Sequence, residues 1–248
     1  MRLNDRISII GSGDTGGFSL THPLDCHAYL LDGGNELALI DAGCGLDIDG
    51  LVQRIIHLNY KPGNIRYLLL THSHFDHSGG VKFLKESFNL QIVASKKTAH
   101  IIQTADKEKS GLGPAQRAGL YPGDLRFDPV NVDIILEDRD TILVGDQTIE
   151  CILTPGHSAD HTAYLLSGIH PVLFSGDSIF TGGKIILQNL PDVILQDYVN
   201  TIYQLSQLEV TALLPGHGML TMNRGQRHLT AARNCLDQLG IPINPTFD

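Results

Sequence analysis

Residues 71–80 read THSHFDHSGG, and they constrain the architecture and the chemistry more than any other segment. They follow an apolar strand predicted over residues 67–71 and precede a predicted helix, with two glycines that relax the backbone between them. One histidine in such a loop is more often a helix cap, but four metal-binding residue types within six positions indicate a metal site. Imidazoles combined with a carboxylate are typical of a catalytic metal. The four candidate ligands are His72, His74, Asp76 and His77.

The backbone has to bend inside this motif. Side chains alternate along an extended chain, so His72, His74 and Asp76 would share one side and His77 would face away. A bend is therefore predicted that brings His77 back beside Asp76.

Three more candidate ligands lie where predicted strands end. His157 lies in a Pro-Gly-His turn after a strand ending at residue 153, Asp177 follows a strand ending at residue 174, and His217 lies in a second Pro-Gly-His turn. Each pattern alone is more often a turn or a cap. Ligands of open α/β sheets gather at the carboxyl ends of strands, so these residues and the motif at 71–80 predict one common site.

Both halves of the chain place predicted strands first and a helix after them. Strands are predicted at residues 6–10, 26–31, 36–41, 67–71, 91–94, 132–136, 148–153, 163–166, 172–174 and 212–214. Helices are predicted at residues 46–58, 79–87, 192–208 and 225–239. This order predicts an α/β fold in which two sheets pack face to face between outer helices, as a four-layer αββα sandwich. One domain over residues 1–248 is expected.

The segment 106–128 interrupts this pattern. It contains four glycines, two prolines and mixed charges, and it predicts a long connection with a helix at its start. Long connections are uncommon in compact domains unless they are functional. We expect it to cover the site, with Tyr121, Arg126 and Phe127 as candidate pocket residues, although a solvated insertion also fits.

Composition excludes several classes of partner. The 248 residues carry 18 Lys plus Arg against 27 Asp plus Glu, a formal charge of −9, which argues against nucleic-acid binding. Polar residues interrupt the start of the chain, so no leader is predicted. No later apolar run is long enough to predict a membrane span. Four scattered cysteines indicate free thiols in a reduced compartment. We therefore expect a cytoplasmic protein with a small-molecule substrate and neither a membrane nor a nucleic-acid partner, and we leave a homodimer open.

The full set of candidate ligands resembles that of the metallo-β-lactamase superfamily, over nearly the whole chain. The resemblance implies the αββα fold and two metal ions, zinc first, with iron or manganese as alternatives. It also implies that Asp177 bridges the two ions. By the same resemblance the first ion is bound by His72, His74 and His157, and the second by Asp76, His77 and His217.

Two metal ions in this site would supply hydrolytic chemistry. Five neutral imidazoles and two carboxylates leave a net charge of +2 around two divalent cations, which favours a bound hydroxide as the nucleophile. Asp76 is the candidate catalytic residue, because it can orient this hydroxide or move its proton. No Gly-x-Ser-x-Gly elbow occurs, so the sequence gives no support for a serine hydrolase.

Two residues are candidates for supporting the ligands. Asp41 ends a predicted strand and resembles the family aspartate that braces the histidine loop, although a turn-initiating aspartate fits as well. His161 lies four residues after His157 and is predicted to support the site by hydrogen bonding.

The resemblance leaves the reaction open among several chemistries. Residues 175–184 resemble the glyoxalase II type, which makes Lys184 a candidate substrate anchor beside Tyr121. Only 31 residues follow His217, so the lactonase-like branch fits better than glutathione-dependent hydrolysis. We expect attack on an ester, thioester or lactone carbonyl. A mononuclear iron persulfide dioxygenase, which would use His72, His157 and Asp177, and a metal-dependent phosphodiesterase remain as alternatives.

Overall fold

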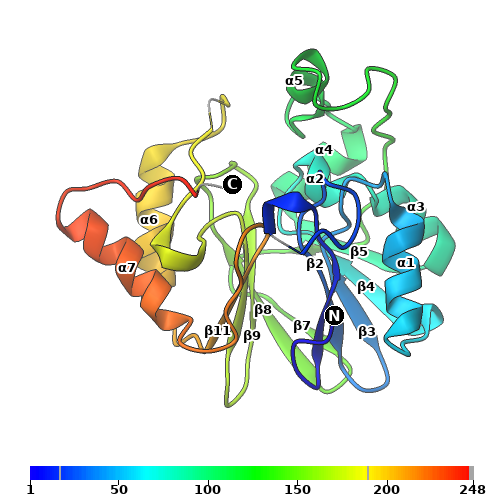
Figure 1. Ribbon diagram of the computed structural model, residues 1–248, viewed down its shortest axis with the longest axis horizontal. Helices are drawn as coiled ribbons and strands as arrows, with labels where there is room; N and C mark the ends of the chain where they lie inside the picture. Colours follow the sequence, from blue (N-terminus) through cyan, green and yellow to red (C-terminus); the bar gives the residue numbers. More distant parts are fainter. Residues whose placement is uncertain (17, 189, 246–248) are drawn as a thin grey trace.

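Two mixed β-sheets form the centre of the protein, as a computed structural model that describes residues 1–16, 18–188 and 190–245 shows (Figure 1). The first sheet has the strand order β1-β2-β3-β4-β5-β6. Its strands β3, β4, β5 and β6 run parallel, and β1 and β2 add antiparallel pairs. The strands are β1 (Ile7–Gly11), β2 (Ala28–Asp32), β3 (Leu37–Ile40), β4 (Ile65–Leu69), β5 (Gln91–Ser95) and β6 (Ile134–Leu136).

The second sheet has the order β11-β10-β9-β8-β7. Strands β10 and β11 are parallel, and the other neighbours pair antiparallel, so β8, β10 and β11 share one direction. The carboxyl ends of these three strands therefore lie at the same edge of the sheet. The strands are β7 (Thr141–Val144), β8 (Gln147–Leu153), β9 (Thr162–Leu166), β10 (Val172–Gly176) and β11 (Ala212–Pro215).

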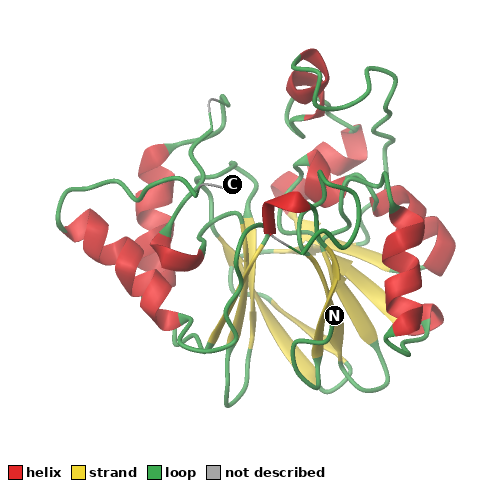
Figure 2. Cartoon of the chain, viewed as in Figure 1, coloured by secondary structure: helices red, strands yellow, loops and turns green. Residues whose placement is uncertain are grey.

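Helices cover the outer face of each sheet (Figure 2). The first sheet is covered by α1 (Ile48–His57), α3 (Val81–Phe88) and α4 (Lys96–Thr104), and the second by α6 (Leu195–Leu205) and α7 (Gln226–Asp237). The shorter elements are α2 (Phe75–Ser78), α5 (Leu112–Arg117) and the 3-10 turns η1 (Asp14–Gly16), η2 (Pro62–Asn64) and η3 (Thr181–Gly183). The predicted αββα sandwich is confirmed.

Three apolar layers hold these four layers together. Strand β2 shows why, because Leu30 packs toward the helices while Tyr29 and Leu31 pack toward the other sheet. Both faces of the central strands are buried, and such strands need nearly continuous apolar sequence. The third layer lies under α6 and α7, where Tyr198 and Leu229 pack on the second sheet. Within the described part of the chain, no helix combines the length and apolar character that crossing a bilayer requires.

Several elements differ from the sequence prediction. Helix α4 and strand β7 were not predicted, since α4 begins with two exposed lysines and β7 has only four residues. In the segment 106–128 the helix lies at Leu112–Arg117 and not at the start, where residues 107–111 form turns. The ends of most other elements move by one to three residues. The bend predicted after His74 is a single helical turn, α2.

Candidate metal centre

One group of candidate ligands contains three buried histidines from two separate loops. His72 and His74 follow β4, and His157 lies in the turn between β8 and β9. Their ring nitrogens lie within 4.8 Å of one another, and His157 Nε2 is 3.0 Å from His74 Nδ1. Zinc binds imidazole nitrogens at about 2.0–2.1 Å, so one ion fits between nitrogens at this separation.

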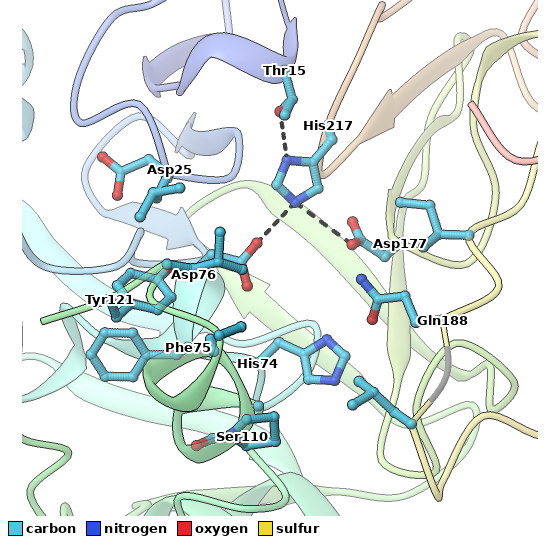
Figure 3. A pocket seen from close by; sticks show the side chains of 18 of the residues that line it. Thr15, Asp25, His74, Phe75, Asp76, Ser110, Tyr121, Asp177, Gln188 and His217 are labelled. Atoms are coloured by element: carbon cyan, nitrogen blue, oxygen red, sulfur yellow. Dashed lines mark hydrogen bonds and ion pairs between the residues drawn. The ribbon is translucent and has the colours of Figure 1, made fainter. Parts of the chain in front are cut away.

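A second group contains Asp76, His77 and His217. Helix α2 places Asp76 and His77 side by side, and His217 follows β11. Asp76 Oδ2 lies 3.0 Å from His217 Nε2 (Figure 3). It also lies 3.6 Å from His77 Nε2. The group can hold a second ion, and it is the more open of the two because the Asp76 side chain is 28% exposed.

Asp177 lies between the two groups. Its Oδ2 is 3.5 Å from His157 Nε2 in the first group and 3.6 Å from His217 Nε2 in the second. Its Oδ1 is 3.6 Å from His77 Nε2. The carboxylate can therefore contact ions held by either group, as the sequence resemblance implies.

Several ligand atoms are buried without a hydrogen-bond partner. They are His72 Nε2, His74 Nε2, His77 Nε2 and Asp177 Oδ1. A buried polar atom without a partner costs about 1–3 kcal/mol, and native proteins contain few of them. His72, His77 and Asp177 also have ligand atoms within 4.8 Å of one another, which fits a site whose partners are metal ions.

Burial keeps two of these histidines, His72 and His157, in the neutral form that binds metals. Burial lowers the pKa of His157 to about 3 and holds the pKa of His72 well below its usual value. Burial alone would raise the pKa of Asp76, but the charge of His77 and a hydrogen bond from His217 outweigh it and hold that pKa at about 2. Asp76 is thus a carboxylate at neutral pH, with lone pairs available to a cation.

Asp41 and His161 contact the candidate ligands from behind. Asp41 Oδ2 lies 2.8 Å from His77 Nδ1, and its carboxylate also accepts hydrogen bonds from the backbone N–H and the hydroxyl of Thr71. His161 Nε2 accepts from the backbone N–H of Asp177 at 2.9 Å. Both contacts fix the orientation of a ligand, which is how outer groups tune a metal site.

Two further contacts were missed by sequence reasoning. Asp160 Oδ2 accepts from the backbone N–H of Ser73 at 2.9 Å, and it thereby ties the β8–β9 turn to the histidine loop. The hydroxyl of Thr15 lies 2.9 Å from His217 Nδ1. Asp160 could have been noticed as the acidic residue inside the second ligand turn. No local pattern points to Thr15, which lies 202 positions from its partner.

Glycines allow the strand ends to approach one another. A side chain at Gly216 would overlap the Asp177 carboxylate and the His77 ring. Gly176 has φ +47° and lies against His161 and Thr71. Substitution at either position would separate the candidate ligands, because neither leaves space for a side chain and Gly176 also has a left-handed backbone.

Four of the candidate ligands, His74, Asp76, Asp177 and His217, line a cavity of about 530 Å³ (Figure 3). His72, His77 and His157 are buried beside them. We call the seven ligands the metal floor. One side of the cavity is formed by α5 and the loop after it, and we call residues 112–121 the α5 wall. Ile186 and Leu190 lie on the cavity as well. Such a volume is typical of sites for small molecules.

The candidate substrate residues lie in different places. Tyr121 lines the cavity, and its ring packs edge-on against Phe75 at 5.2 Å between centroids. Phe127 also packs edge-on against Phe75, with 5.7 Å between the ring centroids. Neither Phe127 nor the exposed Arg126 is among the residues that line the cavity. Lys184 follows η3 and is also outside the lining. The structure thus brings Tyr121, but not Lys184, to the cavity.

Comparisons with known proteins agree with this geometry. The chain is 28% identical to the beta-lactamase-like protein 2 homolog of Caenorhabditis elegans over 88% of its own length and 63% of that protein. It is 30% identical to the acyl-coenzyme A thioesterase MBLAC2 of Gallus gallus, over 86% of this chain and 79% of that protein. The chain thus spans less than two thirds of the Caenorhabditis relative.

Solved structures show the same fold. A motif mutant of the metallo-beta-lactamase of Cronobacter sakazakii superposes with a TM-score of 0.73 at 21% identity, over 96% of this chain and 95% of that one. The sequence model of the metallo-beta-lactamase superfamily matches residues 22–217, a range that contains all seven candidate ligands. The chain belongs to the metallo-β-lactamase superfamily.

Proposed function

We propose that this protein is a hydrolase that depends on two divalent metal ions and cleaves thioesters, and esters or lactones of similar shape. One observation carries the proposal. Seven candidate ligands lie close together, four of them line an open cavity, and four of their buried atoms have no hydrogen-bond partner. The similarity to an acyl-coenzyme A thioesterase supports the choice of thioesters.

The two groups divide the metal ions between them. His72, His74 and His157 would hold one ion and Asp76, His77 and His217 the other, with Asp177 shared. We propose zinc, which suits a set of imidazoles and carboxylates. When bound, such a pair lowers the pKa of a water molecule and polarises a carbonyl oxygen.

The protein's own groups orient the reaction. The Asp41 carboxylate accepts the Nδ1 proton of His77, so that Nε2 turns its lone pair toward the floor. His161 accepts from the backbone N–H of Asp177 and holds that carboxylate between the two groups. Asp76 faces the cavity, and Oδ1 is the oxygen that His217 leaves free to take a proton from the attacking water and pass it to the leaving group.

The alternatives receive less support from the cavity. A phosphodiester carries negative charge, and no Lys or Arg is present among the described residues that line the cavity. A mononuclear iron dioxygenase would need only His72, His157 and Asp177, and it would leave the second group without a use.

The test measures metal content and turnover on the same purified protein. We expect about two metal ions per chain, as in two-metal hydrolases. We also expect hydrolysis of acetyl and butyryl thioesters in the absence of oxygen, lost after chelation and restored by zinc. Protein that was never exposed to chelator and yet holds no metal would contradict the proposal. Oxygen consumption with a persulfide and one iron per chain would support the dioxygenase instead.

A further inference from the structure

Away from the metal floor, most of the residues that line the cavity are apolar, and the polar ones are Thr15, Asp25, Ser110 and Gln188. The α5 wall and the segment that follows residue 184 both contribute apolar residues to the cavity lining. In Figure 3, Tyr121 marks the wall and Gln188 marks the segment after η3. Leu120 is 62% exposed and lies where the wall meets solvent. The apolar lining residues of these two segments include Ala115, Ala118, Leu120, Tyr121, Ile186 and Leu190.

Every charged residue that lines the described cavity is acidic. Asp76 and Asp177 belong to the metal floor, so their charges would be matched by cations bound there. Asp25 is the third, and it stands apart from the floor, where its carboxylate accepts from the backbone N–H groups of Cys44 at 2.7 Å and His22 at 3.1 Å. A substrate carboxylate above the floor would meet this negative charge.

The Lys and Arg side chains near the α5 wall contact other protein groups and do not line the cavity. Arg117, at the end of α5, forms a bidentate pair with Glu108, with both N···O distances 2.7 Å. Lys107 donates to the backbone carbonyl of Leu125 at 3.1 Å. Lys109 lies 3.9 Å from Asp106 Oδ2. None of these side chains is among the cavity lining, so the wall offers no cation to an anionic substrate group.

We propose that the acyl part of the substrate is a neutral, apolar chain that lies along the α5 wall, and that acyl chains ending in a carboxylate are rejected. This inference rests on the proposed function and specifies the substrate class of the same site. Removing an apolar chain from water is favourable by about 0.8 kcal/mol per methylene, whereas an unpaired carboxylate resists burial. The leaving group would point out of the cavity mouth, where it can differ in size.

The experiment compares acyl groups on one constant leaving group. We would measure kcat/KM for N-acetylcysteamine thioesters of acetyl, butyryl, hexanoyl and octanoyl groups, and of the six-carbon adipoyl group with its free carboxylate. The expected rise is about fourfold per methylene until the chain passes Leu120. The adipoyl thioester should be at least about tenfold slower than the hexanoyl one.

Two matched variants locate the effect on the wall. Leu120→Lys introduces a cation at the mouth, and it should raise kcat/KM for the adipoyl thioester about fivefold or more and lower it for the octanoyl thioester. Leu143→Lys is the control, because Leu143 is also 62% exposed but lies on β7, away from the cavity. It should leave the whole series unchanged. Equal behaviour of the two variants would contradict the assignment to the wall.

A binding measurement separates the inference from the proposed function. S-octyl-N-acetylcysteamine is a thioether that cannot be hydrolysed, and calorimetry should show that it binds more tightly than the S-ethyl analogue with a negative heat-capacity change. Turnover of the acetyl thioester with a flat chain-length series, or adipoyl equal to hexanoyl, would overturn only the inference. No turnover of any thioester would contradict the proposed function, and equal binding of the two thioethers would then overturn the inference too.

Discussion

The metal floor and the α5 wall enclose the same cavity but are held in different ways. The floor is buried, and its side chains leave the ends of strands in two sheets, where Asp41 and His161 fix them from behind. The wall is a six-residue helix with a loop, and its outermost residue, Leu120, is largely exposed. The candidate ligands are therefore fixed by the sandwich, whereas the proposed contact with an acyl chain depends on a surface segment whose exposed rim can change without moving them.

The two regions meet at one aromatic contact. Phe75 lies between the ligands His74 and Asp76 in sequence, and its ring packs on Tyr121 of the wall. Its backbone N–H also donates to the carbonyl of Ser110 at 2.9 Å. A change in the wall that moved Phe75 would therefore reach the floor, whereas changes at the rim would not.

The largest expected effect comes from the centre of the floor. Asp177→Ala removes the carboxylate that both ligand groups share, so metal content should fall and thioester hydrolysis should drop by more than about 100-fold, beyond the effect of losing an outer group. Metal analysis and initial rates on the same sample measure this. Asp124→Ala, an exposed carboxylate in the loop after the α5 wall, is the control and should change neither quantity.

A smaller loss should follow from the residue behind the floor. Asp41→Asn keeps the shape of the side chain and suits the left-handed backbone at this position, φ +62°, but it removes the charge that faces His77 Nδ1. Metal affinity should fall about 10–100-fold, which a competition titration with a chelator measures. Asp49→Asn on the exposed side of α1 is the control. Unchanged affinity would show that the floor does not need its support.

Changes beside the cavity should affect substrate binding alone. Tyr121→Phe removes a hydroxyl from the lining but keeps the ring contact with Phe75, so KM should rise about twofold to tenfold, the worth of one hydrogen bond. Lys184→Ala should change KM less than about twofold, because Lys184 is outside the lining. Metal content should stay constant in both variants. Altered metal loading in either would show that floor and wall are not independent.

The smallest effect concerns stability and pH. Burial lowers the pKa of His161 to about 3, so the unfolded chain, with an ordinary histidine pKa near 6.5, binds the proton more readily than the folded one. The contribution of His161 to the free energy of unfolding should therefore be retained completely above pH 6.5. It should be lost as the pH falls toward 3, by at most about 1.4 kcal/mol per pH unit. Urea titrations of the metal-free protein at several pH values measure this dependence. The free energy of unfolding should fall less steeply with decreasing pH in His161→Gln, and as steeply as in the unchanged protein in the exposed His57→Gln.

Much of the floor could be predicted from the sequence, for a local reason. Each candidate ligand follows an apolar strand directly, and the chain direction of a strand fixes the edge at which its last residues emerge. The apolar runs themselves predicted two sheets buried on both faces. Helix α4 could not be predicted in this way, because its periodicity is weak and its first turn carries two lysines.

Only the tertiary structure decided which side chains meet across long stretches of chain. It placed Asp160 under Ser73 and Thr15 beside His217, turned Nδ1 rather than Nε2 of His74 toward His157, and left Lys184 outside the cavity. It also gathered the apolar wall from residues with no shared pattern. The physical reason is that spacing along the chain sets periodicity and direction over a few residues, whereas distances between loops are set by how the two sheets and their helices pack.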